Sequence, residues 1–424
     1  MRNRISALLT YLTVFLLPVQ AVWIFSSVTL AKGDTQYGML LLFGTEIFIA
    51  FATIFRGFPR LGVIAQKMIQ PMYVLVATGF LSLTFSTVYS VGLFSILHLL
   101  SACLLFLLLV DERTDVKKTI VFFVCGLIFP SLLGWFQYLF GWSPAFPLFG
   151  LPIRDAQTLG TAVIETMTGR SLRAYGSFSH PNIFGGYLAI GILFIGWLVS
   201  NNTIKRLKWI YSIPIVIFSS TLIITFSRSA WIATTTALVV LLVISFWKKR
   251  LVAHRAIPLI TLGLFTILIT VIVFHSSVFA RFTPTLRVEA ISFEERTMQY
   301  TTLLPIVRTN PITGVGPGSF VFALANAFPN QPSYVYQPIH NAFLLVFAEI
   351  GIIGILAIVN GLFQLVSIVR KSSSFSGIVF ATSVIIALVW IGLFDHYLWT
   401  FWSGKALVAV SLAMMVRWQK NKVK

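Results

Sequence analysis

Charged residues are scarce in this chain: only 10% of its 424 residues are Asp, Glu, Lys or Arg, and 57% are apolar. The mean hydropathy is +0.91. A soluble globular domain carries about 25% charged residues, so this composition excludes that class. Apolar runs of about 17 to 25 residues match the length of a transmembrane helix, about twice that of a transmembrane strand. The sequence therefore predicts an all-α, polytopic membrane protein with a single integral membrane domain, residues 1–424.

Cysteine and acidic residues are also rare. The two cysteines, Cys103 and Cys125, lie within apolar runs without a metal-ligand spacing, which predicts core packing rather than a metal site. Acidic residues number 12, and those outside the apolar runs are scattered, with no Asp-x-Asp pair for a divalent cation. We therefore expect neither a metal nor another cofactor.

Basic residues, by contrast, number 31 and give a net charge of +19. Such a charge can indicate nucleic-acid binding, but 21 of the 31 fall in short clusters at the ends of alternate apolar runs. This is the positive-inside pattern of cytoplasmic loops, so it excludes nucleic acid as the partner and predicts both termini in the cytoplasm. The clusters are Arg2 and Arg4, Arg56 to Lys67, Arg113 to Lys118, Lys205 to Lys208, Lys248 to Arg255, Arg370 and Lys371, and Arg417 to Lys424.

The apolar runs predict about twelve transmembrane helices of a multi-pass inner (plasma) membrane protein, including a first helix that is retained rather than cleaved. They lie near 6–30, 38–55, 71–89, 91–110, 119–140, 182–200, 209–226, 231–247, 256–274, 341–369, 375–394 and 397–416. Two long segments remain on the extracytoplasmic side, 141–181 and 275–340, where chemistry is expected. The second contains an amphipathic stretch, Glu289 to Arg308, typical of a helix at the lipid surface.

The extracytoplasmic side favours arginine: it holds eight arginines, and Lys32 is the only lysine in its loops. A guanidinium binds phosphate oxygens in a bidentate manner and stays charged in a partly dry site, so this choice predicts a phosphate or pyrophosphate ligand. The alternative is snorkelling to the interface and ion pairing with Glu289, Glu294 and Glu295. The eight are Arg154, Arg170, Arg173, Arg228, Arg281, Arg287, Arg296 and Arg308.

Arg228 is the most costly of these arginines. Almost no loop separates the two predicted helices around it, which places the charge at or below the membrane edge. A charge at a helix centre costs about 2.5 kcal/mol or more, so a partner or a ligand is expected. The position predicts a functional role, and a structural pair with Asp395 or Glu349 is the alternative.

Two histidines lie at predicted helix starts on the same side. His340 follows the long second segment, where a neutral imidazole is suited to accept a proton from an incoming hydroxyl. His180 is a second candidate, although Pro181 and Asn182 beside it equally suit the start of a helix. A lone histidine in either place is also typical of a membrane interface.

Three glycines, Gly314, Gly316 and Gly318, can form either a backbone nest for an anion or simple turns. Within the predicted helices, four residues are ionisable and are expected to be satisfied inside the bundle or to line a proton or ion path. These four are Glu46, His98, Glu349 and Lys405.

Four segments together resemble the O-antigen ligase and O-antigen polymerase superfamily of bacterial membrane glycosyltransferases, enzymes of lipopolysaccharide and other cell-envelope glycans. The resemblance spans about residues 120 to 416. The segments are RAYGSFSHPNIFGGYL (173–188), TFSRSAWIA (225–233), ERTMQYTTLLPIVRTNPITGVGPGSF (295–320) and HNAFLLVFAEIGIIG (340–354).

The family's Arg-x3-Leu signature is similar to Arg228 to Ile232, with Ile in place of Leu, and its His-x10-Gly signature matches His340 to Gly351. Arg296 corresponds to the arginine of the family's long periplasmic loop. Asp395 occupies, by position alone, the place of an acidic residue at the outer end of the penultimate helix.

The resemblance implies transfer of a saccharide from an undecaprenyl-pyrophosphate-linked donor to a hydroxyl of a lipid-anchored or glycan acceptor, with inversion and without a metal. It implies that His340 is the base and that Arg228 and Arg296 clamp the pyrophosphate, with Arg173 a further candidate. Asp395, His180 and Asn182 complete the expected substrate-binding set.

The sequence does not separate a ligase from a polymerase, because both use the same donor and differ in the acceptor. A transporter or flippase of a lipid-linked glycan or anionic solute is the alternative from another class. An outer cavity holding Arg228, Arg296 and His340 would favour transfer, whereas a central cavity around Glu46 and Glu349 would favour transport.

Overall fold

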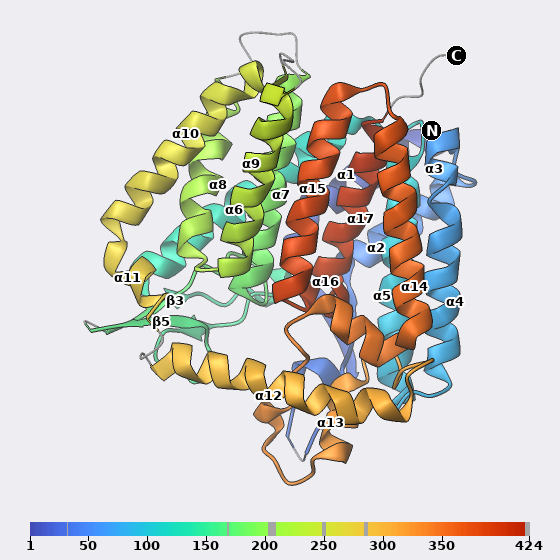
Figure 1. The fold of residues 1–424 in the computed structure, drawn as a ribbon, viewed down its shortest axis with the longest axis vertical. Coiled ribbons are helices and arrows are strands. Elements are labelled where there is room, and N and C mark those ends of the chain that lie inside the picture. The colour runs from blue at the N-terminus through green and yellow to red at the C-terminus, as the bar shows by residue number, and fades with distance from the viewer. Residues whose placement is uncertain (32, 168, 202–208, 248–251, 284–286, 420–424) are drawn as a thin grey trace.

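Long helices run side by side along the long axis of the computed structural model (Figure 1). The structure describes residues 1–424 except 32, 168, 202–208, 248–251, 284–286 and 420–424. The N-terminus and the end of α17 (Trp402–Arg417) lie at the same end of this bundle, and α12 (Arg287–Thr309) runs across the opposite end. We call these the inner and the outer end.

Each of the twelve predicted spans overlaps one helix of the bundle. Within the described residues, seven helices are long and apolar enough to cross a membrane, namely α5, α6, α7, α9, α10, α14 and α15. A polytopic helical membrane protein is thereby confirmed, whereas the count of twelve spans stays a prediction. The twelve helices are α1 (Arg2–Leu16), α2 (Gly44–Arg56), α4 (Ile69–Leu83), α5 (Tyr89–Val110), α6 (Val116–Phe140), α7 (Pro181–Ser200), α8 (Ser212–Ile224), α9 (Arg228–Trp247), α10 (Val252–Val273), α14 (Ala342–Lys371), α15 (Phe375–Phe394) and α17 (Trp402–Arg417).

The predicted first span, 6–30, is too long. Helix α1 ends at Leu16, because Pro18 lacks an amide proton and its ring clashes with the preceding turn. Residues Val22–Ser27 form strand β1 instead, which pairs antiparallel with β2 (Met39–Phe43). The apolar run 6–30 contains both a helix and a strand, and hydropathy alone does not distinguish the two.

Two further hairpins lie in the segment 141–181, so an all-α fold holds only for the bundle. Strand β3 (Trp142–Ser143) pairs with β4 (Arg154–Asp155), and β5 (Val163–Thr166) pairs with β6 (Gly169–Leu172). Figure 1 places β3 and β5 at the outer end, on the same side as α12. The remaining short helices are α3 (Val63–Gln66), α11 (His275–Ala280), α13 (Phe320–Ala327) and α16 (Tyr397–Thr400).

Helix α14 was predicted as one continuous span, but it is broken at Ile350 and Gly351. Gly351 has φ of 69°, and a Cβ at this position would overlap the main-chain oxygen of Ile312. The loop before α13 replaces the missing helical hydrogen bonds, because the amide of Val315 donates to the carbonyl of Ala348 at 2.9 Å. Glycine at position 351 is therefore required by the backbone itself.

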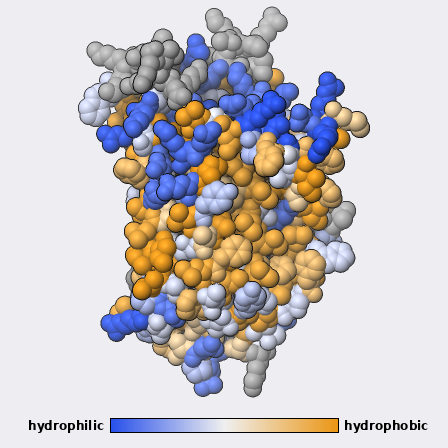
Figure 2. All heavy atoms as spheres, turned by 90° about the vertical axis from the view of Figure 1, so that its right-hand side faces the viewer, coloured by the Kyte–Doolittle hydropathy of each residue, from blue (hydrophilic) through white to orange (hydrophobic). Residues whose placement is uncertain are grey.

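A broad hydrophobic belt covers the middle of the face shown in Figure 2, between hydrophilic side chains at both ends. This belt is what a lipid-facing surface requires. The basic clusters predicted at Lys205 to Lys208 and Lys248 to Arg250, and those of the tail after Gln419, lie outside the described residues.

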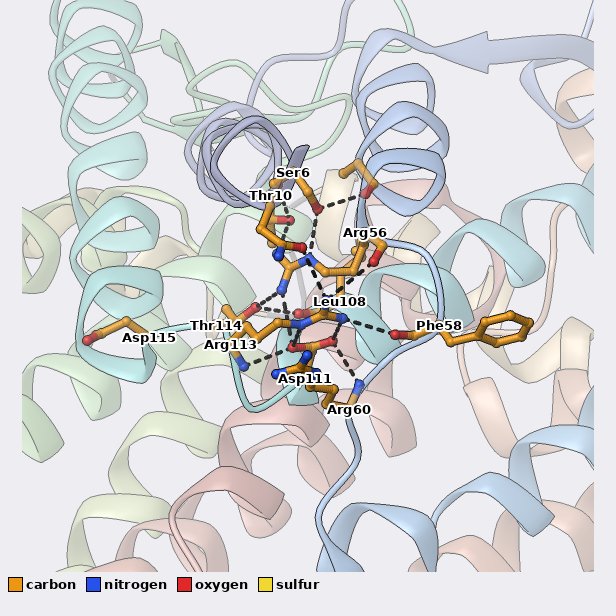
Figure 3. A network of polar contacts seen from close by, with 12 residues as sticks. Ser6, Thr10, Arg56, Phe58, Arg60, Leu108, Asp111, Arg113, Thr114 and Asp115 are labelled. Carbon is orange, nitrogen blue, oxygen red and sulfur yellow. Dashed lines mark hydrogen bonds and ion pairs between the residues drawn. The ribbon is translucent and has the colours of Figure 1, made fainter. Parts of the chain in front are cut away.

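The inner end is held by a buried ionic network (Figure 3). Asp111, whose side chain is fully buried, pairs with Arg56 at 3.3 Å and with Arg113 at 2.6 Å. The Arg56 guanidinium also donates to Ser6 at 2.7 Å and to Thr114 at 3.1 Å. Since a buried charge is tolerated only when it is paired and hydrogen-bonded, this network fixes α1, α2 and α5 to one another.

Helix α7 occupies the centre of the bundle, and 94% of the residues in its 18-residue apolar stretch are buried. Small residues allow close packing here: a Cβ on Gly186 would overlap the Tyr397 hydroxyl. The outer start of α7 is therefore surrounded by other elements, and this is where the predicted site residues converge.

Candidate active site

A chain of hydrogen bonds crosses the outer end of the bundle. Arg173, at the end of the first outer segment, donates from Nη2 to the side-chain oxygen of Asn182 at 2.7 Å. Asn182 in turn donates from Nδ2 to the Asp395 carboxylate at 2.7 Å. Three residues that the sequence predicted in one site are thus brought together from the first outer segment, α7 and the end of α15.

His180 is the N-cap of α7, and its Nδ1 accepts a hydrogen bond from the amide of Asn182 at 3.1 Å. Pro181 follows at the first helical position, where its missing amide proton costs nothing. Burial and the nearby Arg173 charge lower the pKa of His180 to about 3. A neutral His180 therefore shapes the start of α7, which agrees with the helix-start reading of this residue.

Asp395 joins two helix ends. It caps α15, and its carboxylate accepts from the amide of His396 at 2.8 Å. Its main-chain oxygen accepts from the amide of Ala342, the first residue of α14, at 3.1 Å. Asp395 therefore fixes the end of α15 to the start of α14, directly beside His340.

His340 lies at the end of the long outer segment, just before the N-cap Asn341 of α14. Its ring packs against that of His396 at a centroid distance of 5.3 Å. Burial lowers the pKa of His340 below its ordinary value of 6.5, the Asp395 charge raises it, and the Arg296 charge lowers it. The imidazole is therefore neutral near pH 7, as a proton acceptor must be.

Arg296 lies on α12, one turn before Gln299, which contacts His340 directly. Its charge influences both His340 and the adjacent Glu295. The amphipathic stretch predicted between Glu289 and Arg308 is thus helical, and it carries Arg296 to the histidine.

Arg228 begins α9 directly after a tight turn that follows α8. Phe226 in this turn has φ of 50°, an unusual value for a bulky side chain. Two other arginines contact this turn directly. Arg173 Nε donates to the carbonyl of Thr225 at 2.8 Å, and Arg281 Nε donates to the carbonyl of Phe226 at 3.0 Å. Arg228 Nη1 donates to the carbonyl of Arg281 at 3.3 Å.

This turn connects Arg228 to the rest of the site, because Arg173 contacts both the turn and Asn182. The two carboxylates considered as structural partners of Arg228 bind other groups. Asp395 accepts from Asn182, and Glu349 accepts from the amide of Gly318 at 2.8 Å and from Trp399 Nε1 at 2.7 Å.

The predicted glycine nest binds a side chain of the protein itself. Gly318 donates to the Glu349 side chain, and Gly316 donates to the Glu349 main-chain oxygen at 2.9 Å. The three glycines all have positive φ. They therefore serve the break in α14 rather than a substrate.

The other ionisable residues within the helices are also satisfied inside the bundle. His98 Nδ1 lies 2.8 Å from the Glu46 carboxylate. Lys405 donates to the carbonyl of Thr400 at 3.3 Å and lies 5.6 Å from the Trp399 ring centroid. This agrees with the first of the two alternatives for these residues.

Sequence reasoning missed three residues of the site. Gln299 is spaced one turn from Arg296, and His396 is adjacent to Asp395, so both had a weak local signal. Tyr37, in the loop between β1 and β2, had none. Its ring lies 6.3 Å from that of His396 and 6.1 Å from that of Phe401. Burial raises the pKa of Tyr37, so its hydroxyl stays protonated.

Two features complete the surroundings of the site. Among the described residues, no group of three His, Cys, Asp or Glu side chains is arranged to hold a metal ion.

A largely apolar cavity of about 280 Å³ lies between α4, α5, α14, α15 and α17, and Phe343, Trp399 and Lys405 are among its lining residues.

Residues 213–359 match the family model described as O-antigen ligase. Over this segment the chain is similar to the O-antigen ligase family. The match confirms the resemblance and contains Arg228, Arg296 and His340, whereas Arg173, His180, Asn182 and Asp395 lie outside it. No curated protein gives a significant sequence match to the chain. The family supports a membrane ligase or polymerase of the glycosyltransferase kind that uses lipid-linked glycans.

Proposed function

We propose that this protein transfers a saccharide from an undecaprenyl-pyrophosphate-linked donor to an acceptor hydroxyl on the extracytoplasmic face, with inversion and without a metal. In this reaction the bond between the acceptor oxygen and the anomeric carbon forms as the bond from that carbon to the pyrophosphate oxygen breaks. The acceptor's proton moves to His340, and the electron pair leaves with the pyrophosphate.

The observation that carries this proposal is the convergence of a neutral histidine and several arginines at one end of the bundle. His340 lies beside Asp395, and the Asp395 side chain leads through Asn182 to Arg173. A base for the acceptor and cations for the leaving group are both needed in such a transfer, and these elements supply both.

We assign the pyrophosphate clamp to Arg228 and Arg296, with Arg173 as a further contributor. Arg173, Arg228 and Arg281 donate to main-chain oxygens around the turn after α8, and these contacts orient each guanidinium. Oriented guanidinium groups stabilise the charge that develops on the leaving oxygens, which is the role a divalent cation plays in other transferases. Asp395, His180 and Asn182 then position the segments that carry the base and the clamp.

The proposal includes twelve spans with both termini in the cytoplasm. The N-terminus and the end of α17 lie at the inner end of the bundle. Arg56 and Arg113 pair with Asp111 there, and Arg417 donates to the carbonyl of Thr114. Reporter fusions test this topology. A cytoplasmic reporter is expected to be active after residue 417, and a periplasmic one near residue 310; the reverse result would refute it.

A transporter of lipid-linked glycan is the second candidate, and two observations favour it. Helix α14 is broken within the membrane-spanning region, and Lys405 lines the apolar cavity. The loop that contains Gly314, Gly316 and Gly318, however, occupies this break and donates hydrogen bonds to its carbonyl oxygens. The break is therefore not open to a ligand. The cavity is lined neither by Arg228, Arg296 and His340 nor by Glu46 and Glu349, so it does not decide between the two functions.

Reconstitution decides between them. The purified protein is placed in liposomes with a lipid-pyrophosphate glycan and either a lipid-anchored acceptor or a second copy of the donor. Transferase activity predicts a glycosylated acceptor and released lipid pyrophosphate in equal amounts. Movement of the glycan across the bilayer without any acceptor product would instead support transport. Transfer to the lipid-anchored acceptor would indicate a ligase, and transfer to the second copy of the donor would indicate a polymerase.

A further inference from the structure

The side chain of Gln299 makes two contacts with one residue. Its Oε1 lies 3.1 Å from the main-chain nitrogen of His340 and 2.9 Å from Nδ1 of the same histidine. Gln299 is only 8% exposed and lies on the buried side of α12, one turn after Arg296. Helix α12 therefore holds the backbone and the ring of His340 through a single amide oxygen.

This double contact fixes the protonation of the ring. A main-chain N–H can only donate, so the group that faces it must be the oxygen of the glutamine amide and not its nitrogen. The same oxygen accepts from Nδ1, which must then carry the proton of the neutral imidazole. The lone pair of the ring therefore resides on Nε2.

We infer that Gln299 is a positioning residue that locks His340 in the Nδ1–H form, so that Nε2 is the atom that removes the acceptor's proton. This inference rests on the proposed role of His340 as the base. During transfer the hydroxyl proton moves to Nε2, which leaves a cationic imidazole with protons on both nitrogens, and Nδ1–H stays bonded to Gln299 throughout.

A neutral amide at this position has a chemical consequence. A carboxylate in its place would favour the charged imidazole and raise the pKa of His340, whereas an amide orients the ring without that effect. The charged and titratable groups that surround His340 are Arg296 on α12, Asp395 and His396 after α15, and His180 at the start of α7. Gln299 therefore orients the base without adding a negative charge that would stabilise its protonated form.

Two substitutions separate geometry from charge. Gln299→Met keeps the approximate size but removes the acceptor, so we expect kcat to fall about 10- to 100-fold while the KM for the donor changes little. Gln299→Glu keeps an acceptor oxygen but adds a charge, so we expect the acidic limb of kcat/KM to move up by about one pH unit or more. Thr301→Glu is the control, because it adds the same charge to an exposed position of α12.

The tautomer can be measured without any turnover. The chain has six histidines, so ¹⁵N-histidine spectra of the full-length protein and of His340→Ala identify the His340 signals by difference. We expect Nδ1–H in the native protein and a mixture with Nε2–H in Gln299→Met. Nε2–H in the native protein, or an unchanged tautomer, rate and pH profile in Gln299→Met, would overturn the inference.

The two proposals fail in different ways. If His340→Ala transfers saccharide at the native rate, His340 is not the base and the proposed mechanism falls, whatever the tautomer. If His340→Ala is inactive but Gln299→Met behaves as the native protein in every measurement, the base assignment stands and the role of Gln299 is refuted.

Discussion

The two ends of the bundle use arginine in different ways. At the inner end, Arg56 and Arg113 share the buried carboxylate of Asp111, so both guanidinium groups are paired within the protein. At the outer end, Arg173 and Arg281 donate to the carbonyl oxygens of a tight turn. These outer contacts are made to main-chain oxygens rather than to a carboxylate.

The two kinds of arginine contact suit different purposes. A buried pair of opposite charges ties helices together and offers nothing to a ligand. A guanidinium oriented by main-chain oxygens keeps donors in a fixed geometry, which is what recognition of a diphosphate requires. We therefore place stability at the inner end and chemistry at the outer end, and the following substitutions test that division.

The largest effect is expected at the base. His340→Ala should reduce the rate of single-turnover transfer by about 10²- to 10⁴-fold, the usual contribution of a general base, while donor affinity changes little. His275→Ala is the matched control, because His275 is an exposed histidine at the start of α11. A loss explained wholly by weaker donor binding would remove His340 from this role.

The arginines come next. Arg228→Ala and Arg296→Ala should each lower kcat/KM by about 10²-fold, as the loss of one transition-state donor does. Lysine at either position should restore only part of this, because an ammonium cannot bind in a bidentate manner. Arg308→Ala, on the exposed last turn of α12, should turn over normally. Equal activity of Arg228→Ala and the native protein would make Arg228 structural.

The smallest expected effect is a shift in pH dependence. The charge of Arg296 lowers the pKa of His340, so Arg296→Ala should raise this pKa by less than about one unit. His340 is inactive when protonated, so the residual kcat/KM should begin to fall at a higher pH than in the native protein. Asp395 acts in the opposite sense, and Asp395→Asn should move the same limb to lower pH.

Hydropathy and charge located the bundle helices, because membrane-spanning helices have a strong and local sequence signal. They failed where an apolar run changes its backbone: Val22–Ser27 is a strand, and α14 breaks at Gly351. Both departures are enforced by long-range contacts, namely the pairing with Met39–Phe43 and the loop containing Val315. A window of sequence does not contain these contacts.

Only part of the candidate site could be predicted from the sequence. The family motifs contain His340, Arg228 and Arg296, and the position of Asp395 at a helix end indicated that residue. Tyr37 was not predictable, because it reaches His396 from a hairpin far away in the chain. The role of Gln299 depends on where α12 crosses the outer end, which no spacing within α12 reveals.

One paired measurement tests the division most directly: transfer rate and thermal stability of purified His340→Ala and Asp111→Asn. His340→Ala is predicted to melt as the native protein does and to lose transfer. Asp111→Asn leaves Arg56 buried without its carboxylate, so it is predicted to lose about 3 kcal/mol of stability, while its folded fraction turns over at the native rate. A stable Asp111→Asn variant that has lost transfer, beside an active His340→Ala, would contradict the account.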